Sequence, residues 1–202
     1  MTPRKHDSQV SIKDILDPNL DPSKRVVKSF SDLKKIVKNF KTAGFKIVLT
    51  QGVWDLIHEG HAAYLQKARE HGDILIVGID SDELTRQRKG PRRPIVPEGE
   101  RIRMLSHLRH VDVIVLRESH QDIGELVRVV APDVFVVSQT TKDFTKSMKE
   151  SYGDVCGEIV DLKHQATTTT SARIRNLAIE GAEDLANEIG QLIQKFLNGL
   201  KK

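Results

Sequence analysis

Apolar residues along the chain fall into short runs that are separated by helical stripes. Five runs rich in Val, Ile and Leu lie at residues 46–50, 74–79, 111–116, 134–137 and 157–162. Continuous apolar runs of this length are typical of strands that are buried on both faces of a parallel sheet. The pattern therefore predicts five parallel strands.

The segments between these runs carry apolar residues at the three- and four-residue spacing of amphipathic helices. The predicted helices span residues 31–44, 60–71, 98–108 and 123–130, with one more that begins at Ser171 and a last one at 182–199. Ser31 is a favourable N-cap for the first of them. Alternating strands and helices predict an α/β fold, a Rossmann-like, doubly wound parallel sheet with helices on both faces.

The ends of the chain differ from this central pattern. Residues 1–30 are polar, contain three prolines and show no sustained period, which predicts a flexible arm ahead of an α/β domain at residues 31–180. Residues 181–202 form a C-terminal amphipathic helix with one apolar stripe. The stripe either packs on the chain's own sheet or contacts a second copy, and a homodimer is the expectation.

Composition narrows the class of protein. The formal net charge of the 202 residues is +4, and the sequence pI of about 9.1 is mildly basic. This balance suits an anionic substrate, while the spread of both signs along the chain makes nucleic acid an unlikely partner. A single cysteine, Cys156, excludes an internal disulfide. No apolar run approaches the length of a membrane span and residues 1–8 do not resemble a signal peptide, so a cytoplasmic protein without membrane contact is expected.

The junction after the first predicted strand carries the most informative residues. His58 and His61 stand three apart where a helix begins, with Gly60 between them. Helical spacing places both imidazoles on one side of the first turn, and the helix N-terminus attracts anions to the same place. Isolated histidines are usually surface or core residues, and a His-x-x-His pair also occurs in metal sites. The surrounding strand, glycine and helix favour phosphate binding.

Two further segments contain groups that bind phosphate. A basic cluster after the second strand comprises Arg86, Arg88, Lys89, Arg92 and Arg93. Arginine and lysine match phosphate oxygens, although such a cluster is often a solvated loop. Hydroxyl residues including Thr170 and Ser171 precede a helix that also carries Arg173 and Arg175. These hydroxyls serve equally as helix caps or as phosphate ligands.

The ordered set of motifs resembles a known family. His58-Glu-Gly-His61 after a first strand looks like the signature of the cytidylyltransferase-like nucleotidyltransferases. Within that family the chain most resembles the bacterial heptose-1-phosphate adenylyltransferase domains. The resemblance runs from the helix before the first strand to about residue 180 and includes Gly72-Asp73, Ser81-Asp82, residues 89–94, Glu100-Arg101 and residues 169–175.

The resemblance implies roles for individual residues. It implies that His58, His61 and Lys89 are catalytic and stabilise the triphosphate. The nucleotide and its phosphates would contact Gln51, Gly52, Val53, Trp54, Gly60, Thr170, Ser171, Arg173 and Arg175. The acceptor would contact Asp55, Arg88 and Arg101, although Asp55 serves equally well as a structural hydrogen-bonding residue. Mg²⁺ is the expected cofactor, held on the triphosphate and not by the protein alone.

The expected reaction is the transfer of a nucleoside monophosphate, AMP from ATP, to a sugar phosphate such as heptose 1-phosphate, with release of pyrophosphate. Gln51 stands where heptose enzymes usually have asparagine, so the base and the acceptor stay open. One alternative is a cytidylyltransferase that uses CTP and glycerol phosphate or another alcohol phosphate. An alternative of another class is a non-catalytic nucleotide sensor.

Overall fold

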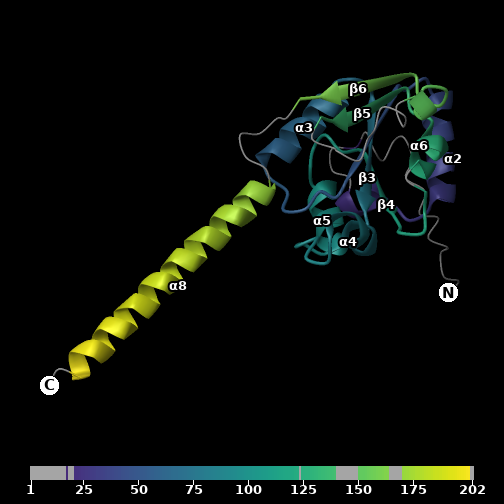
Figure 1. Ribbon diagram of the computed structural model, residues 1–202. Helices are drawn as coiled ribbons and strands as arrows, with labels where there is room; N and C mark the ends of the chain where they lie inside the picture. Colours follow the sequence, from purple (N-terminus) through teal and green to yellow (C-terminus); the bar gives the residue numbers. More distant parts are fainter. Residues whose placement is uncertain (1–16, 18–20, 123, 140–149, 164–169, 201–202) are drawn as a thin grey trace, which may run out of the picture. The chain divides into compact units, whose positions relative to one another are not determined.

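A computed structural model describes residues 17, 21–122, 124–139, 150–163 and 170–200 (Figure 1). The chain divides into two compact units, Met1–Ala166 and Thr167–Lys202. The first unit contains the sheet, and the second contains one long helix.

A parallel sheet of six strands forms the centre of the first unit. Its strands are β1 (Val26–Val27), β2 (Ile47–Gly52), β3 (Ile74–Asp80), β4 (Val113–Arg117), β5 (Val134–Ser138) and β6 (Glu158–Leu162). They lie in the order β1-β4-β3-β2-β5-β6, and every neighbouring pair is parallel. The Rossmann-like α/β class is confirmed, but the expected count of five strands is wrong. β1 was missed because two residues are too few to show an apolar period.

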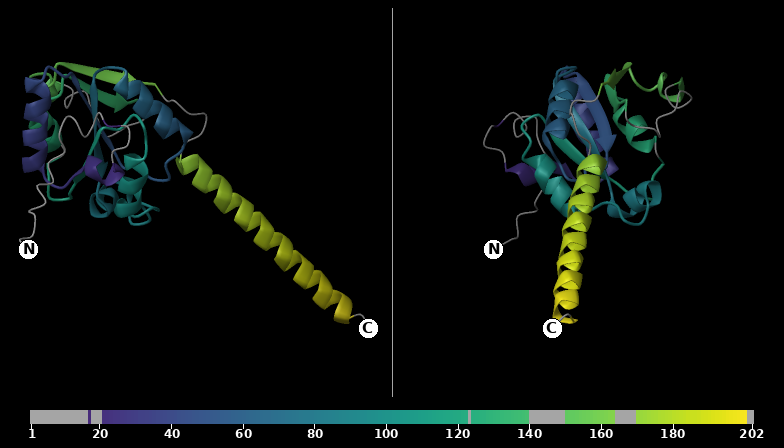
Figure 2. Two further views of the ribbon diagram at one scale, coloured as in Figure 1. Left: turned by 180° about the vertical axis from the view of Figure 1, so that it is seen from behind. Right: turned by 60° about the vertical axis from the view of Figure 1, so that its left-hand side comes forward.

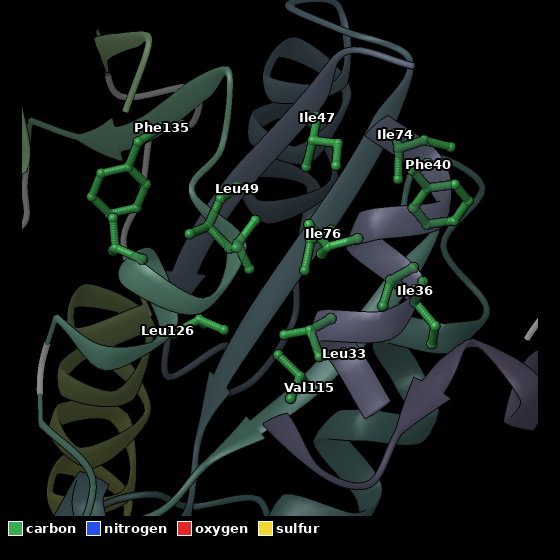
Figure 3. Packing of buried hydrophobic residues seen from close by; sticks show 14 of the residues in the cluster. Leu33, Ile36, Phe40, Ile47, Leu49, Ile74, Ile76, Val115, Leu126 and Phe135 are labelled. Atoms are coloured by element: carbon green, nitrogen blue, oxygen red, sulfur yellow. The ribbon is translucent and has the colours of Figure 1, made fainter. Parts of the chain in front are cut away.

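Helices cover both faces of the sheet (Figure 1). They are the 3-10 helix η1 (Pro22–Arg25), α2 (Phe30–Thr42), α3 (Glu59–Arg69), α4 (Asp82–Lys89), α5 (Glu98–Ser106) and α6 (Glu125–Val130). The apolar residues of α2 and α6 join one core cluster, and those of α3 and α5 join the other. Figure 3 shows Leu33, Ile36 and Phe40 of α2 beside Ile74 and Ile76 of β3.

Two helix predictions need correction. α2 begins at Phe30, one residue before the expected start, because the hydroxyl of Ser29 accepts a 3.1 Å hydrogen bond from the amide of Asp32 and so caps the helix. α4 was not predicted at all. Its sequence has few apolar residues, and only Leu84 and Thr85 are buried. The basic cluster therefore begins on a helix instead of lying wholly in a loop.

Part of the expected N-terminal arm is structured. η1 and β1 lie within residues 21–30, and β1 pairs with β4 through Val26 and Val27. Arg25 Nη1 donates hydrogen bonds to the carbonyls of Ser106 and Leu108, at 2.9 and 3.2 Å. These long-range contacts hold the segment on the first unit, which a polar, proline-containing sequence does not reveal. Residues 1–16 and 18–20 of the expected arm lie outside the described part of the chain.

The second unit consists of α8 (Thr170–Leu200), one helix where the sequence predicted two (Figure 2). Gly181 lies inside it, so the boundary expected between residues 180 and 181 falls within a continuous helix. Several large apolar side chains of α8 are 48–67% exposed, namely Leu177, Ile179, Leu185, Ile189, Leu192 and Ile193. Among the described residues, none of the helices combines the length and the apolar character that crossing a bilayer requires.

Strand register determines where the first unit can bind a ligand. Gly52 of β2 pairs with Ile79 of β3, and Asp80 of β3 pairs with Arg117 of β4. The carboxyl ends of three adjacent strands therefore meet at one edge, where ligands bind in open parallel sheets.

Candidate functional site

His58 and His61 hold each other in place where α3 begins. The Gly60 amide donates a 3.0 Å hydrogen bond to Nδ1 of His58, which is the N-cap of the helix. The His58 amide donates in turn to Nδ1 of His61, at 3.3 Å. The two ring centroids lie 4.1 Å apart, with an angle of 38° between the ring planes. The first turn thus orients both imidazoles through its own backbone.

These hydrogen bonds determine the tautomer of each ring. A nitrogen that accepts from a backbone N–H carries no proton, so the ring proton of both His58 and His61 is on Nε2. Both side chains are therefore N–H donors at their outer nitrogen. Together with the positive end of the α3 dipole, they suit the charge that develops on a phosphoryl group under attack.

The site loop, residues 53–58, joins β2 to α3 and is anchored by Trp54. The buried indole donates a 3.0 Å hydrogen bond to the Gly78 carbonyl in β3, and its ring centroid lies 5.8 Å from that of His61. Trp54 and Leu56 have positive φ values of 57° and 45°. Such backbone is costly for residues other than glycine, and at Trp54 the buried, hydrogen-bonded indole holds it in place.

Tyr64 secures α3 to the sheet behind the histidines. Its hydroxyl pairs with the Thr50 hydroxyl at 2.9 Å and donates to the Val136 carbonyl at 3.2 Å. Burial raises the pKa of this hydroxyl, so it stays protonated and keeps its role as a donor. The N-terminus of α3 is consequently fixed relative to β2 and β5.

Asp55 connects the site loop to the segment after α4. Its carboxylate accepts hydrogen bonds from the amides of Ile95 and Val96, at 2.9 and 3.0 Å. It also forms a 3.2 Å ion pair with Arg93, and its side chain is only 2% exposed. This geometry agrees with the structural role that the sequence left open for Asp55.

Arg101, which the resemblance assigned to the acceptor, is 1% exposed. Its guanidinium donates to the carbonyls of Val53, Val96 and Asp80 and pairs with the Asp82 carboxylate at 2.6 Å. These partners come from the site loop, from the segment before α5 and from the end of β3. In this structure Arg101 therefore holds these three segments together from inside the protein.

Comparison with known proteins places this geometry in a family. The cytidylyltransferase-like family model matches residues 49–177, more than half of the chain. The chain belongs to the cytidylyltransferase-like family. The matched range contains most of β2, the site loop and both histidines, so the family match covers the residues that form this site.

This cytidylyltransferase-like chain has curated relatives that include proteins named HldE. It is 36% identical over 148 residues to the "Bifunctional protein HldE" of Desulfatibacillum aliphaticivorans, covering 73% of this chain and 30% of that protein. It is 44% identical over 104 residues to the protein of the same name from Helicobacter pylori strain G27, covering 52% and 22%. The chain spans about a third of the length of such relatives.

Solved structures support the same fold. A lipopolysaccharide core biosynthesis protein from Thermoplasma volcanium matches with a TM-score of 0.53 and 27% identity, over 61% of this chain and all of that one. A pantoate-beta-alanine ligase from Francisella tularensis matches with a TM-score of 0.52 and 15% identity, over 70% and 67%. The second likeness concerns the fold alone.

The basic cluster of this cytidylyltransferase-like chain divides into two groups. Arg88 pairs with Asp80, and Arg93 pairs with Asp55, so both face other side chains of the unit. Arg86, Lys89 and Arg92 are exposed. Lys89 is the last residue of α4, and Gly90 follows it with a φ of 94°, which turns the chain at that point. The cluster is therefore partly structural and partly available to an anion.

Three predicted residues of β2 and the site loop have limited exposure. Gln51 and Gly52 end β2, and a Cβ at Gly52 would lie 3.4 Å from the Trp54 ring. The Gln51 Oε1 atom is buried without a hydrogen-bond partner among the described residues. Val53 offers its carbonyl to Arg101. The buried Oε1 atom of Gln51 can accept a hydrogen bond from a ligand or a water at little cost in free energy.

The predicted hydroxyl-rich segment belongs to the second unit. Thr170 and Ser171 occupy the first turn of α8, which agrees with the expected helix start. The side chains of Thr170, Ser171 and Arg173 lie outside the described residues, whereas Arg175 is exposed on the helix. Their expected contact with the triphosphate stays a prediction.

The family implies Mg²⁺ on a bound triphosphate. Across the ranges that the structure describes, the side chains of His, Cys, Asp and Glu form no group of three that could hold a metal ion. Mg²⁺ on the triphosphate stays a prediction.

Sequence reasoning overlooked Asp80 and Arg117 at the carboxyl edge. Their carboxylate and guanidinium pair at 2.7 Å between neighbouring strands, and both side chains are at most 3% exposed. A charged residue that closes an apolar strand run was the available signal, because such a side chain needs a partner when the strand end is buried.

Proposed function

We propose that the chain transfers AMP from ATP to a sugar phosphate such as heptose 1-phosphate and releases pyrophosphate. One observation carries the proposal: His58 and His61 both accept backbone hydrogen bonds at Nδ1 where α3 begins, within the part of the chain that matches the cytidylyltransferase-like family, which leaves Nε2 as the N–H donor of each ring. Paired donors and a helix dipole stabilise an anionic transition state without moving.

The proposed reaction is a direct displacement at phosphorus. An oxygen of the acceptor phosphate attacks the α-phosphorus, and the bond from that phosphorus to the oxygen bridging to the β-phosphorus breaks. The electron pair of the broken bond leaves with pyrophosphate, and a new phosphoanhydride joins AMP to the acceptor. The acceptor oxygen is already anionic, so catalysis consists of holding two polyanions together and stabilising the charge between them.

Each group in the site has a proposed part in this step. His61 and His58 donate from Nε2 to triphosphate oxygens, and the positive end of the α3 dipole attracts the same anion. Lys89, exposed at the end of α4, adds a mobile positive charge. Mg²⁺, when bound to the triphosphate, neutralises part of its charge.

Two comparisons support the choice of a sugar phosphate. The relative from Thermoplasma volcanium is named as a lipopolysaccharide core biosynthesis protein, and it is matched over its whole length. Several curated relatives named HldE are 34–44% identical to this chain. A sugar phosphate is also consistent with Gln51, whose buried Oε1 would accept a hydrogen bond from an acceptor hydroxyl.

A pyrophosphate-release screen tests the proposal. ATP, CTP, GTP and UTP are each combined with heptose 1-phosphate, other sugar phosphates and glycerol phosphate in the presence of Mg²⁺. We expect the fastest release with ATP and a sugar 1-phosphate, and adenylylated product by mass spectrometry. Preference for CTP with glycerol phosphate would replace the substrates of the proposal, and nucleotide binding without release from any pair would identify a sensor instead.

We also propose that the protein is a homodimer joined through α8. Leu185, Ile189, Leu192 and Ile193 follow three- and four-residue spacing and are 48–67% exposed. A second copy of α8 offers the same apolar stripe, and pairing of two such stripes removes both from water.

A further inference from the structure

The exposed apolar side chains of α8 include a narrow seam along one side of the helix. Leu185, Ile189 and Leu192 follow one another at spacings of four and three residues, and each is 48–67% exposed. We call these three residues the α8 seam. Alternating steps of four and three residues are the a and d positions of a coiled coil, where the side chains of one helix pack against those of another. The seam therefore fits a partner helix that carries the same spacing.

The two flanks of the α8 seam differ in chemistry. In the heptad that the seam defines, Glu188 and Lys195 both occupy the g position, and both are exposed. The e positions on the other flank hold Ala186 and Ile193, which are also exposed. One flank thus carries opposite charges about two helical turns apart, whereas the other flank is apolar.

The placement of these charges selects the direction in which two copies of α8 can pair. In a parallel pair, the g position of one helix faces the e position of the other. Glu188 would then lie against Ile193 of the second copy and would lose water without gaining a partner. In an antiparallel pair, g faces g and e faces e. With Ile189 opposite Leu192 of the second copy, Glu188 comes beside Lys195, and two-fold symmetry forms the same pair a second time.

The sign of the charge along α8 favours the same direction. Within residues 176–202, acidic residues occur only before the midpoint of the seam and lysines occur only after it. The acidic residues are Glu180, Glu183, Asp184 and Glu188, and the lysines are Lys195, Lys201 and Lys202. Parallel copies would place acidic residues beside acidic residues, which repel each other. Antiparallel copies place the acidic part of each helix beside the part of the other that contains Lys195.

We propose that α8 pairs in antiparallel orientation with α8 of a second copy, through the α8 seam and two reciprocal ion pairs between Glu188 and Lys195. This inference rests on the homodimer of the proposed function and specifies its geometry. The seam supplies most of the affinity, because pairing removes its apolar surface from water. The two ion pairs contribute less to affinity and determine the orientation.

A distance measurement between spin labels on the full-length protein tests the orientation. The label is attached to E180C in a C156A background, because position 180 is exposed and lies opposite the seam. In the antiparallel pair, the two copies of this position are about 20 residues apart along the helix direction, or about 30 Å. Together with the width of the pair, this predicts a separation of about 35–40 Å. A parallel pair in register places the labels at the same height, about 20 Å apart.

Charge reversal tests the ion pairs independently of the labels. E188K replaces both attractive pairs with repulsive ones, so at low salt we expect the Kd of the dimer to rise about tenfold. K195E should have the same effect. The double variant E188K/K195E restores both pairs with the charges exchanged, and its Kd should return to within about twofold of the wild-type value. E180K, the same substitution on the side opposite the seam, is the matched control and should leave the Kd nearly unchanged.

The outcomes separate this inference from the proposals on which it builds. A label separation near 20 Å, or a double variant that stays as weak as the single ones, would overturn the antiparallel pairing while leaving the dimer in place. A monomeric wild type, or an assembly larger than two chains, would overturn both the pairing and the dimer. Nucleotidyl transfer is judged separately, by pyrophosphate release from the same preparations.

Discussion

The indole N–H of Trp54 donates a 3.0 Å hydrogen bond to the carbonyl of Gly78, which joins the site loop to the strand beside it. Gly78 has a second function on the opposite side of its backbone. Its missing Cβ leaves room for Arg117, Leu126 and Gln51, all of which approach that position. One glycine thus supports both the loop that leads to the histidines and the close packing of Arg117 and Leu126 against β3.

Gly78→Ala should destabilise the protein. The new methyl group would lie 2.5 Å from Leu126 Cδ2 and 3.1 Å from Gln51 Cβ, so overpacking should cost about 1–3 kcal/mol. Urea unfolding followed by circular dichroism measures the change. Gly181→Ala is the matched control, since nothing lies within 4 Å of a Cβ there and helical alanine is favoured by about 1 kcal/mol. Equal stability of wild type and Gly78→Ala would contradict the packing account.

His61→Ala should lower kcat by on the order of 10²-fold or more, as the loss of one transition-state donor does in other enzymes. The variant also removes the acceptor for the His58 amide, so thermal stability is measured alongside turnover. His107→Ala, an exposed histidine at the end of α5, is the control and should keep full activity. Turnover at the wild-type rate would exclude His61 from the mechanism.

Arg101→Met should act on stability before it acts on binding. The substitution leaves the carbonyls of Val53, Val96 and Asp80 without their donor, at a cost on the order of 3 kcal/mol. Arg103→Met, at an exposed position of the same helix, should cost little. Urea midpoints compare the two. An Arg101→Met protein with wild-type stability and a raised acceptor KM would instead support the acceptor contact that the family resemblance implies.

Cys156 should react slowly with thiol reagents at pH 8. Burial raises the pKa of its thiol to about 11, so the folded protein contains little thiolate at that pH. The folded state then holds this proton more tightly than the unfolded chain, whose thiol has a pKa of about 9. The contribution to stability is thus complete below pH 9 and is lost as the pH rises from 9 to 11. Labelling rates at pH 8 and 10, with urea-unfolded protein as the control, measure the difference, and equally fast labelling of both states would refute it.

Substitutions on α8 should change the mass of the particle in solution. Ile189→Glu together with Leu192→Glu places charges on the exposed apolar stripe and should convert a dimer to a monomer. Light scattering after gel filtration gives the mass. Gln191→Glu, an exposed position between the two, adds the same kind of charge and should leave the dimer intact. A monomeric wild type would show that the stripe has another partner.

Local patterns in the sequence were sufficient for most of the fold. The four strands that form the centre of the sheet, β2 to β5, coincide with apolar runs, because strands buried on both faces need apolar residues throughout. Two of the elements that escaped were weak in the same way. β1 is only two residues long, and α4 has few buried positions, so neither carries a period that a sequence can display.

In the candidate site, too, the sequence predicted the local contacts and not the distant ones. His58 and His61 are three residues apart, and the geometry of a helix start alone brings their rings together, so their pairing was readable from the sequence. The partners of Arg101 come from three segments between 5 and 48 positions away, and Asp80 lies 37 positions from Arg117. Charged residues at such separations have many possible partners in an unfolded chain. Only strand register and burial select one of them, because a buried charge must find its counterpart among the groups that the sheet has brought within reach.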